Sequence, residues 1–79
     1  MTVKLFASLR EAVGRSHVEL ELAEGATLES AFAKLAQDHP GLSGRRGSLA
    51  AAVNRRYAPF DTELADGDEV AFIPPVSGG

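Results

Sequence analysis

Hydrophobic and polar residues alternate along three segments of the chain, which is the two-residue period of a β-strand with one buried face. The first segment, residues 2–9 (TVKLFASL), places its Val, Leu and Ala residues on one side. The second, residues 17–22 (HVELEL), alternates throughout, and we expect it to pair with the first as an antiparallel hairpin. The intervening residues 10–14 are predicted to form no more than one helical turn. The third segment, residues 69–73 (EVAFI), follows a turn of the Asp-Gly kind at residues 65–68.

One segment has a helical period instead. Thr27 is placed to cap a helix, and Glu29 suits the first turn. The helix is predicted to end at residues 38–41, because Pro40 cannot continue it and restricts the residue before it. The helical spacing of i, i+3, i+4, i+7 and i+8 is shared by five apolar residues: Leu28, Ala31, Phe32, Leu35 and Ala36.

The order of the elements favours one fold class. Residues 42–48 are predicted to be an exposed connection, and residues 49–53 are apolar enough for an interior strand. A short strand is expected at residues 57–58, limited by Pro59. One main helix crossing a mixed sheet in this order is the β-grasp arrangement, an α+β fold. We expect a single domain over residues 1–79, in which residues 74–79 form an extended tail.

Composition narrows the functions open to this fold. The chain has 79 residues, which is enough for one hydrophobic core. It contains no cysteine, which excludes thiol catalysis, disulfides and cysteine metal sites. The formal net charge of −3 argues against a nucleic-acid partner. No apolar run approaches the roughly 20 residues of a membrane span, and residues 1–4 do not resemble a signal peptide, so we expect no membrane partner and a cytoplasmic location.

Candidate catalytic side chains are sparse. His17 and His39 lack metal-ligand spacing, so they are interpreted as surface histidines and no metal site is expected. No serine lies in the sequence context of an activated nucleophile. The two arginine pairs, residues 45–46 and 55–56, are interpreted as solvated loop charges, with contact to an acidic partner as the less favoured alternative.

Two apolar residues depart from the alternating pattern, and a third could lie beside them. Phe6 falls on the polar side of the first predicted strand, and Ile73 falls on the polar side of the last. These two strands are neighbours in a β-grasp sheet, and Tyr57 could join them on the same open face. A contiguous apolar patch of this kind would indicate a protein interface. The alternative is that they are scattered surface residues without function.

The chain ends in two glycines, Gly78 and Gly79, after Pro74 and Pro75. Taken alone, a terminal Gly-Gly is more often disordered or left over from cloning than functional. On a compact one-helix domain, however, such an end can enter a narrow channel. Glycine permits close backbone approach and leaves the terminal carboxylate unhindered.

Three motifs resemble one known family. They are residues 6–11 (FASLRE), residues 53–54 (VN) and above all residues 67–79 (GDEVAFIPPVSGG). Together they are similar to the MoaD family, the small sulfur-carrier subunits of molybdopterin synthase, which are ubiquitin-like β-grasp proteins. The resemblance covers essentially the whole chain. Thiamine-pathway sulfur carriers and ubiquitin-related protein modifiers share the Gly-Gly end and remain the alternatives.

The resemblance implies a function for the C-terminal residue. The Gly79 carboxylate would be adenylated by an E1-like partner using ATP and Mg²⁺, and then converted to a thiocarboxylate. Within a heterotetrameric molybdopterin synthase, its sulfur would pass to cyclic pyranopterin monophosphate during molybdenum cofactor biosynthesis. The chain itself would bind no cofactor and would be a non-catalytic subunit, with the catalytic residues on the large subunit.

The resemblance and the sequence pattern together predict two groups of site residues. The predicted partner-binding residues are Phe6, Arg10, Tyr57 and Ile73. The predicted tail that carries Gly79 is made of Pro74, Pro75, Val76, Ser77 and Gly78.

Overall fold

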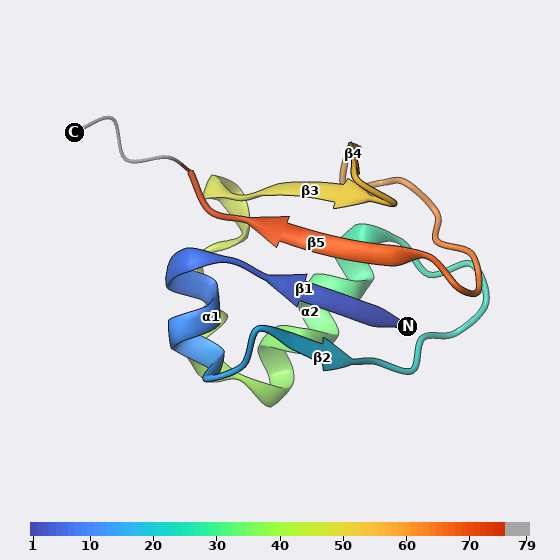
Figure 1. Cartoon of the computed structure of the whole chain (residues 1–79). Coiled ribbons are helices and arrows are strands. Elements are labelled where there is room, and N and C mark those ends of the chain that lie inside the picture. Colours follow the sequence, from blue (N-terminus) through green and yellow to red (C-terminus); the bar gives the residue numbers. More distant parts are fainter. Residues whose placement is uncertain (76–79) are drawn as a thin grey trace.

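The computed structural model describes residues 1–75, which contain one five-stranded mixed sheet in the order β2-β1-β5-β3-β4 (Figure 1). The central strand β5 pairs in parallel with β1 and antiparallel with β3, and the outer pairs are antiparallel. The predicted β-grasp fold is therefore confirmed. The strands are β1 (Thr2–Leu5), β2 (His17–Glu19), β3 (Ala50–Val53), β4 (Arg56–Tyr57) and β5 (Glu69–Ile73).

The longest helix, α2 (Leu28–Asp38), packs across one face of this sheet (Figure 1). Its N-terminus is closed as predicted, because the Thr27 hydroxyl accepts a hydrogen bond from the Ser30 amide at 3.2 Å and the Ser30 hydroxyl accepts one from the Thr27 amide at 2.8 Å. The helix ends at Asp38, directly before a 3-10 turn at Pro40–Leu42.

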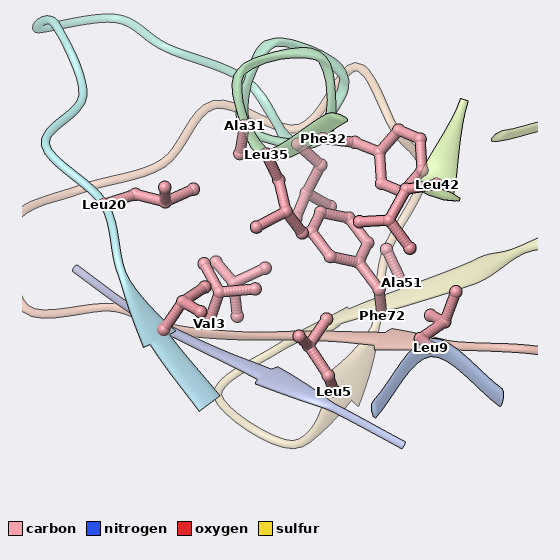
Figure 2. Packing of buried hydrophobic residues seen from close by; sticks show 13 residues of the cluster. Val3, Leu5, Leu9, Leu20, Ala31, Phe32, Leu35, Leu42, Ala51 and Phe72 are labelled. Carbon is pink, nitrogen blue, oxygen red and sulfur yellow. The ribbon is translucent and has the colours of Figure 1, made fainter. Parts of the chain in front are cut away.

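The core fills the space between α2 and the sheet (Figure 2). Strand residues of one parity, such as Val3 and Phe72, point into it and are 0% exposed. Phe72 packs edge-to-face on Phe32, with ring centroids 5.2 Å apart, and stacks on Phe60 at 6.0 Å. The Phe72 ring thus joins β5 both to helix α2 and to the 58–64 segment.

A second helix, α1 (Ala7–Val13), replaces part of the predicted first strand. The expectation of a strand over residues 2–9 and of no more than one helical turn afterwards was therefore wrong. Leu9 is fully buried as the alternation suggested, but it is buried from the helix. Gly14 ends α1 at φ 84°, and its amide donates to the Arg10 carbonyl at 2.7 Å.

Two other segments also differ from the predicted pattern. The strand expected over residues 17–22 pairs only to Glu19. Residues 42–48, expected to be an exposed connection, contain the buried Leu42 and a 3-10 turn at Arg46–Ser48. The Arg46 guanidinium lies 3.6 Å from the Phe60 ring centroid, and its Nε is 2.6 Å from a Glu29 carboxylate oxygen. Arg46 is therefore a packed residue as well as a surface charge.

Among residues 1–75, neither helix has both the length and the apolar character needed to cross a bilayer.

Candidate functional site

The strand that leads to the C-terminus is the central strand of the sheet. In β5, Phe72 is fully buried under α2, and the adjacent Ile73 lies half-buried on the opposite face. The chain then continues through Pro74, which is half-buried, and Pro75, which is exposed. The predicted tail residues Val76, Ser77, Gly78 and Gly79 lie outside the described residues.

The face of the sheet opposite α2, here called the open face, brings three predicted partner-binding residues together. Phe6, Tyr57 and Ile73 line one shallow depression of about 280 Å³, with Ala52 and Ala71 between them. Phe6 is 46% exposed and Tyr57 is 76% exposed, and they are the large hydrophobic side chains with high exposure within residues 1–75. Small side chains below exposed aromatic ones create a concave apolar surface, which is typical of a protein-docking site.

The three residues reach this depression by different routes. Tyr57 pairs across strands with Ala52, and Ala52 pairs with Ala71 of the central strand. Phe6 was predicted to lie in the first strand, but it is the N-cap of α1. The next residue, Ala7, has a left-handed φ of 49°. The location of Phe6 on the open face is thus as expected, although the element that places it is different.

Charged residues surround the depression. The Lys4 ammonium lies 3.4 Å from a Glu69 carboxylate oxygen, and Arg55 lines the same hollow. The predicted partner-binding residue Arg10 does not line it and is exposed on α1. Figure 1 shows α1, the helix that contains Arg10, at the end of the sheet where β5 ends.

A hydrogen-bond cluster fixes the edge of the open face. The Asp68 carboxylate accepts hydrogen bonds from the Ala65 amide at 2.7 Å and from the Asn54 side-chain amide at 2.9 Å. These two donors, the Ala65 amide first, lower the pKa of Asp68 below its ordinary value. Farther along the sheet, the Thr2 hydroxyl donates to Glu19 and lowers the pKa of that carboxyl.

The described residues also form hollows outside the open face, and one of about 330 Å³ is lined by both His17 and His39. Another hollow, of about 820 Å³, lies between residues 20–26 and 64–66, and its ionisable side chains are the carboxylates of Glu21, Glu24 and Asp66. Met1 also lines it, and its α-ammonium group donates a hydrogen bond to the Leu20 carbonyl at 2.9 Å. Within residues 1–75, no cluster of three or more His, Cys, Asp or Glu residues could hold a metal ion.

The sheet, its crossing helix and its open face define this protein as a ubiquitin-like β-grasp domain. Residues 3–79, a range that includes Gly78 and Gly79, match the model of the ThiS family. The chain belongs to the ThiS family. It is 44% identical to the molybdopterin synthase sulfur carrier subunit of Escherichia coli, over an alignment covering 98% of this chain and 96% of the relative. The resemblance to sulfur-carrier subunits inferred from the motifs is therefore confirmed.

Solved structures give the same fold. The crystal structure of SAMP1 from Haloferax volcanii matches with a TM-score of 0.88 and 35% identity, covering 99% of this chain and 97% of that one. A complex of subunits 1 and 2 of the molybdopterin-converting factor from Helicobacter pylori contains a chain that matches with a TM-score of 0.67 and 25% identity, covering 99% and 96%. Within this fold, the name of the first structure denotes a modifier and that of the second a molybdopterin subunit.

Proposed function

We propose that this protein is the sulfur carrier of molybdopterin synthase, with Gly79 as the residue that holds the sulfur. The observation that carries the proposal is the full-length match to sulfur carrier subunits in a chain that ends in Gly-Gly. The absence of cysteine from the sequence agrees with it, because the sulfur must then be held by a group other than a thiol.

The proposed loading reaction has two steps at Gly79. A free carboxylate resists substitution because it would have to expel oxide, so its oxygen first attacks the α-phosphate of ATP and releases pyrophosphate. This gives an acyl-adenylate, and it requires an E1-like activating enzyme that supplies Mg²⁺. A sulfide sulfur can then attack the acyl carbon, so that AMP leaves and a thiocarboxylate remains. Where the donor is a persulfide, the same attack gives an acyl disulfide, and a second thiol of the donor protein attacks its S–S bond, which releases the thiocarboxylate and leaves a disulfide on the donor. The need for ATP also favours a cytoplasmic location.

The loaded carrier would then dock on the large subunit of molybdopterin synthase. The open face supports this step, because the exposed Phe6 and Tyr57 and the half-buried Ile73 lie on one face of the sheet whose central strand precedes the C-terminal residues. The thiocarboxylate sulfur would attack a carbon of the cyclic pyranopterin precursor and displace an oxygen substituent from it. Water would then hydrolyse the resulting thioester, which leaves the sulfur on the precursor and restores the Gly79 carboxylate. A dithiolene holds two sulfur atoms, so the carrier acts as a reloadable co-substrate.

Acid–base groups for this chemistry are assigned to the large subunit. The hollow on the open face contains Lys4 and Glu69, but these two side chains pair with each other. His17 and His39 are not among the residues that line it. The proposed role of this chain is therefore to present a reactive C-terminus and a docking surface.

The structural match to SAMP1 favours one second candidate, a protein modifier that forms isopeptide bonds through the same activated Gly79. Both candidates begin with adenylation, so ATP consumption does not separate them. They differ in what attacks the acyl-adenylate, which is sulfur in the carrier and a lysine amine in the modifier.

Intact-mass spectrometry after incubation with the activating enzyme, ATP and a sulfur donor separates the two candidates. The carrier gains the mass difference between one sulfur and one oxygen atom, whereas the modifier appears as an adduct on a target lysine. Deleting Gly79, or appending one residue after it, should abolish loading without changing the melting temperature. Gly78→Ala is the matched control and should load more slowly. Loading that persists without Gly79 would refute the proposal.

A further inference from the structure

The turn between β3 and β4 has an arginine, Arg55, in a backbone conformation that usually requires glycine. Asn54 and Arg55 join the two strands, and both have left-handed φ values, 52° and 71°. Two-residue hairpin turns with both φ values positive strongly favour Asn-Gly, because a Cβ atom is disfavoured there. Arg55 occupies the position at which glycine would be most stable, so the side chain at this position has a cost in folding stability.

The turn is held in place by the neighbouring strand. The Asn54 side chain donates to Asp68 at 2.9 Å and accepts from the Glu69 amide at 3.0 Å, and the Asn54 backbone amide donates to the Glu69 carbonyl at 2.8 Å. These contacts fix the backbone of the turn relative to β5. Strained residues that the surrounding structure holds in this way cluster at functional sites.

The Arg55 side chain lines the open-face depression together with Phe6 and Tyr57. Two acidic residues next to the turn already have partners, since Glu69 pairs with Lys4 and Asp68 accepts hydrogen bonds from Asn54 and Ala65. Within residues 1–75, no carboxylate forms an ion pair with Arg55. Arg55 is therefore a cation that lines the open-face depression and has no ion-pair partner among the described residues.

We propose that Arg55 is a specificity-determining residue that pairs with a carboxylate of the large subunit when that subunit covers the open face. This inference rests on the proposed function, which supplies the partner. The guanidinium can bind a carboxylate through two parallel hydrogen bonds, and a charge at the rim of an interface accelerates association. The turn by itself would favour glycine at position 55. Recognition of the large subunit then explains why an arginine is found there.

The chain offers a matched control for this proposal in the adjacent arginine. Arg56 pairs with Val53, which packs against the core, so the register places Arg56 on the face opposite the depression. Arg55→Glu and Arg56→Glu make the same change in net charge on opposite faces. Association of each variant with the large subunit is measured by stopped flow at low and high salt.

Arg55→Glu should lower the association rate constant about 10-fold at low salt, and the difference should shrink at high salt. Arg56→Glu should change it less than about 2-fold, and Arg55→Lys should retain most of the wild-type rate. Arg55→Gly should weaken binding while raising the melting temperature, because it relieves the left-handed backbone. Equal effects of Arg55→Glu and Arg56→Glu would overturn the proposal, since net charge alone would then explain them.

The outcome for Phe6→Ala distinguishes this inference from the proposed function. If Phe6→Ala weakens binding and Arg55→Glu does not, the open face docks the large subunit and Arg55 has no part in selecting it. If neither substitution changes binding, the large subunit does not dock on the open face, and the docking step of the proposed function fails together with the role of Arg55. Binding of the wild-type chain to the large subunit is measured first in both cases.

Discussion

The two faces of the sheet use aromatic residues in opposite ways. On the helix-covered face, Phe72 is 0% exposed and contacts the rings of Phe32 and Phe60. On the open face, Phe6 and Tyr57 are exposed and lie around alanine side chains. The covered face therefore supplies folding free energy, and the open face retains apolar area that a partner can bury.

One strand belongs to both faces. In β5, the consecutive residues Phe72 and Ile73 point to opposite sides, because successive strand residues alternate. The same strand is thus anchored in the core, contributes to the proposed docking surface and precedes the C-terminal residues. A central strand that is paired on both sides is well suited to position the proposed reactive C-terminus.

The largest effect is expected from a truncation on the covered face. Phe72→Ala removes the ring that joins α2 to the 58–64 segment, and it should cost about 3–5 kcal/mol of unfolding free energy. A chain of 79 residues has roughly 4–12 kcal/mol in total, so this variant should be largely destabilised. Urea unfolding followed by circular dichroism measures the loss. A cost below about 1 kcal/mol would show that the covered face is not the main source of stability.

A truncation on the open face should separate binding from stability. Phe6→Ala should weaken binding to the large subunit by about 10- to 100-fold, as expected for an aromatic anchor, with an unfolding cost below about 1 kcal/mol. Isothermal titration calorimetry gives the affinity. Phe32→Ala and Leu20→Ala are the controls for a buried truncation. A Phe6 variant that unfolds as easily as these controls would remove the distinction between the two faces.

The hydrogen-bond cluster at the edge of the open face should make a small, pH-dependent contribution to stability. Because the pKa of Asp68 is lowered in the folded protein, its contribution is present above the ordinary pKa of 3.8 and is lost as the pH falls through the lowered value. Asp68→Asn should therefore lower the melting temperature at neutral pH, and the difference from wild type should disappear in strong acid.

Asp66→Asn is the control for that measurement, since Asp66 belongs to the same turn and accepts no side-chain hydrogen bond within the described residues. Equal effects of the two substitutions at neutral pH would show that the Asp68 hydrogen bonds do not stabilise the fold.

The smallest effect is expected at three polar side chains to which no catalytic role is assigned. His17→Ala, His39→Ala and Ser77→Ala should transfer sulfur at rates within a few-fold of wild type once the thiocarboxylate has formed. Acid–base catalysis typically contributes about 10²–10⁴-fold, so the loss of a catalytic group would be evident. Single-turnover assays with excess large subunit isolate this step. A hundredfold decrease would show that this chain supplies a catalytic side chain.

The parts of the fold that are governed by local pattern were predictable from the sequence. Helix α2 has both a helical apolar period and the Thr27 cap, and it begins where that residue indicates. Strand β5 has strict alternation after an Asp-Gly turn, and its bounds are as predicted. The location of Phe6 and Ile73 on one face was predicted because both break the alternation, and Tyr57 was predicted to join them from its position beside the turn after the third strand.

The parts that depend on tertiary contacts were not predictable in this way. Helix α1 was missed because Leu9 continues the alternation of β1 and is buried in either conformation. The packing of Arg46 on Phe60 joins residues far apart in the sequence, and a lone arginine does not indicate it. The left-handed backbone of Arg55 was also missed, because the usual glycine is absent from that turn.

The most direct test of the sulfur-carrier role is a single-turnover transfer experiment. Chain bearing a preformed Gly79 thiocarboxylate is mixed with excess large subunit and the cyclic pyranopterin precursor, and both the product and the intact mass of the chain are followed. We predict that molybdopterin forms with two chains consumed per dithiolene, and that each chain returns to the mass of the free carboxylate. A chain that keeps its sulfur, or that appears as an adduct on a lysine of another protein, would contradict this account.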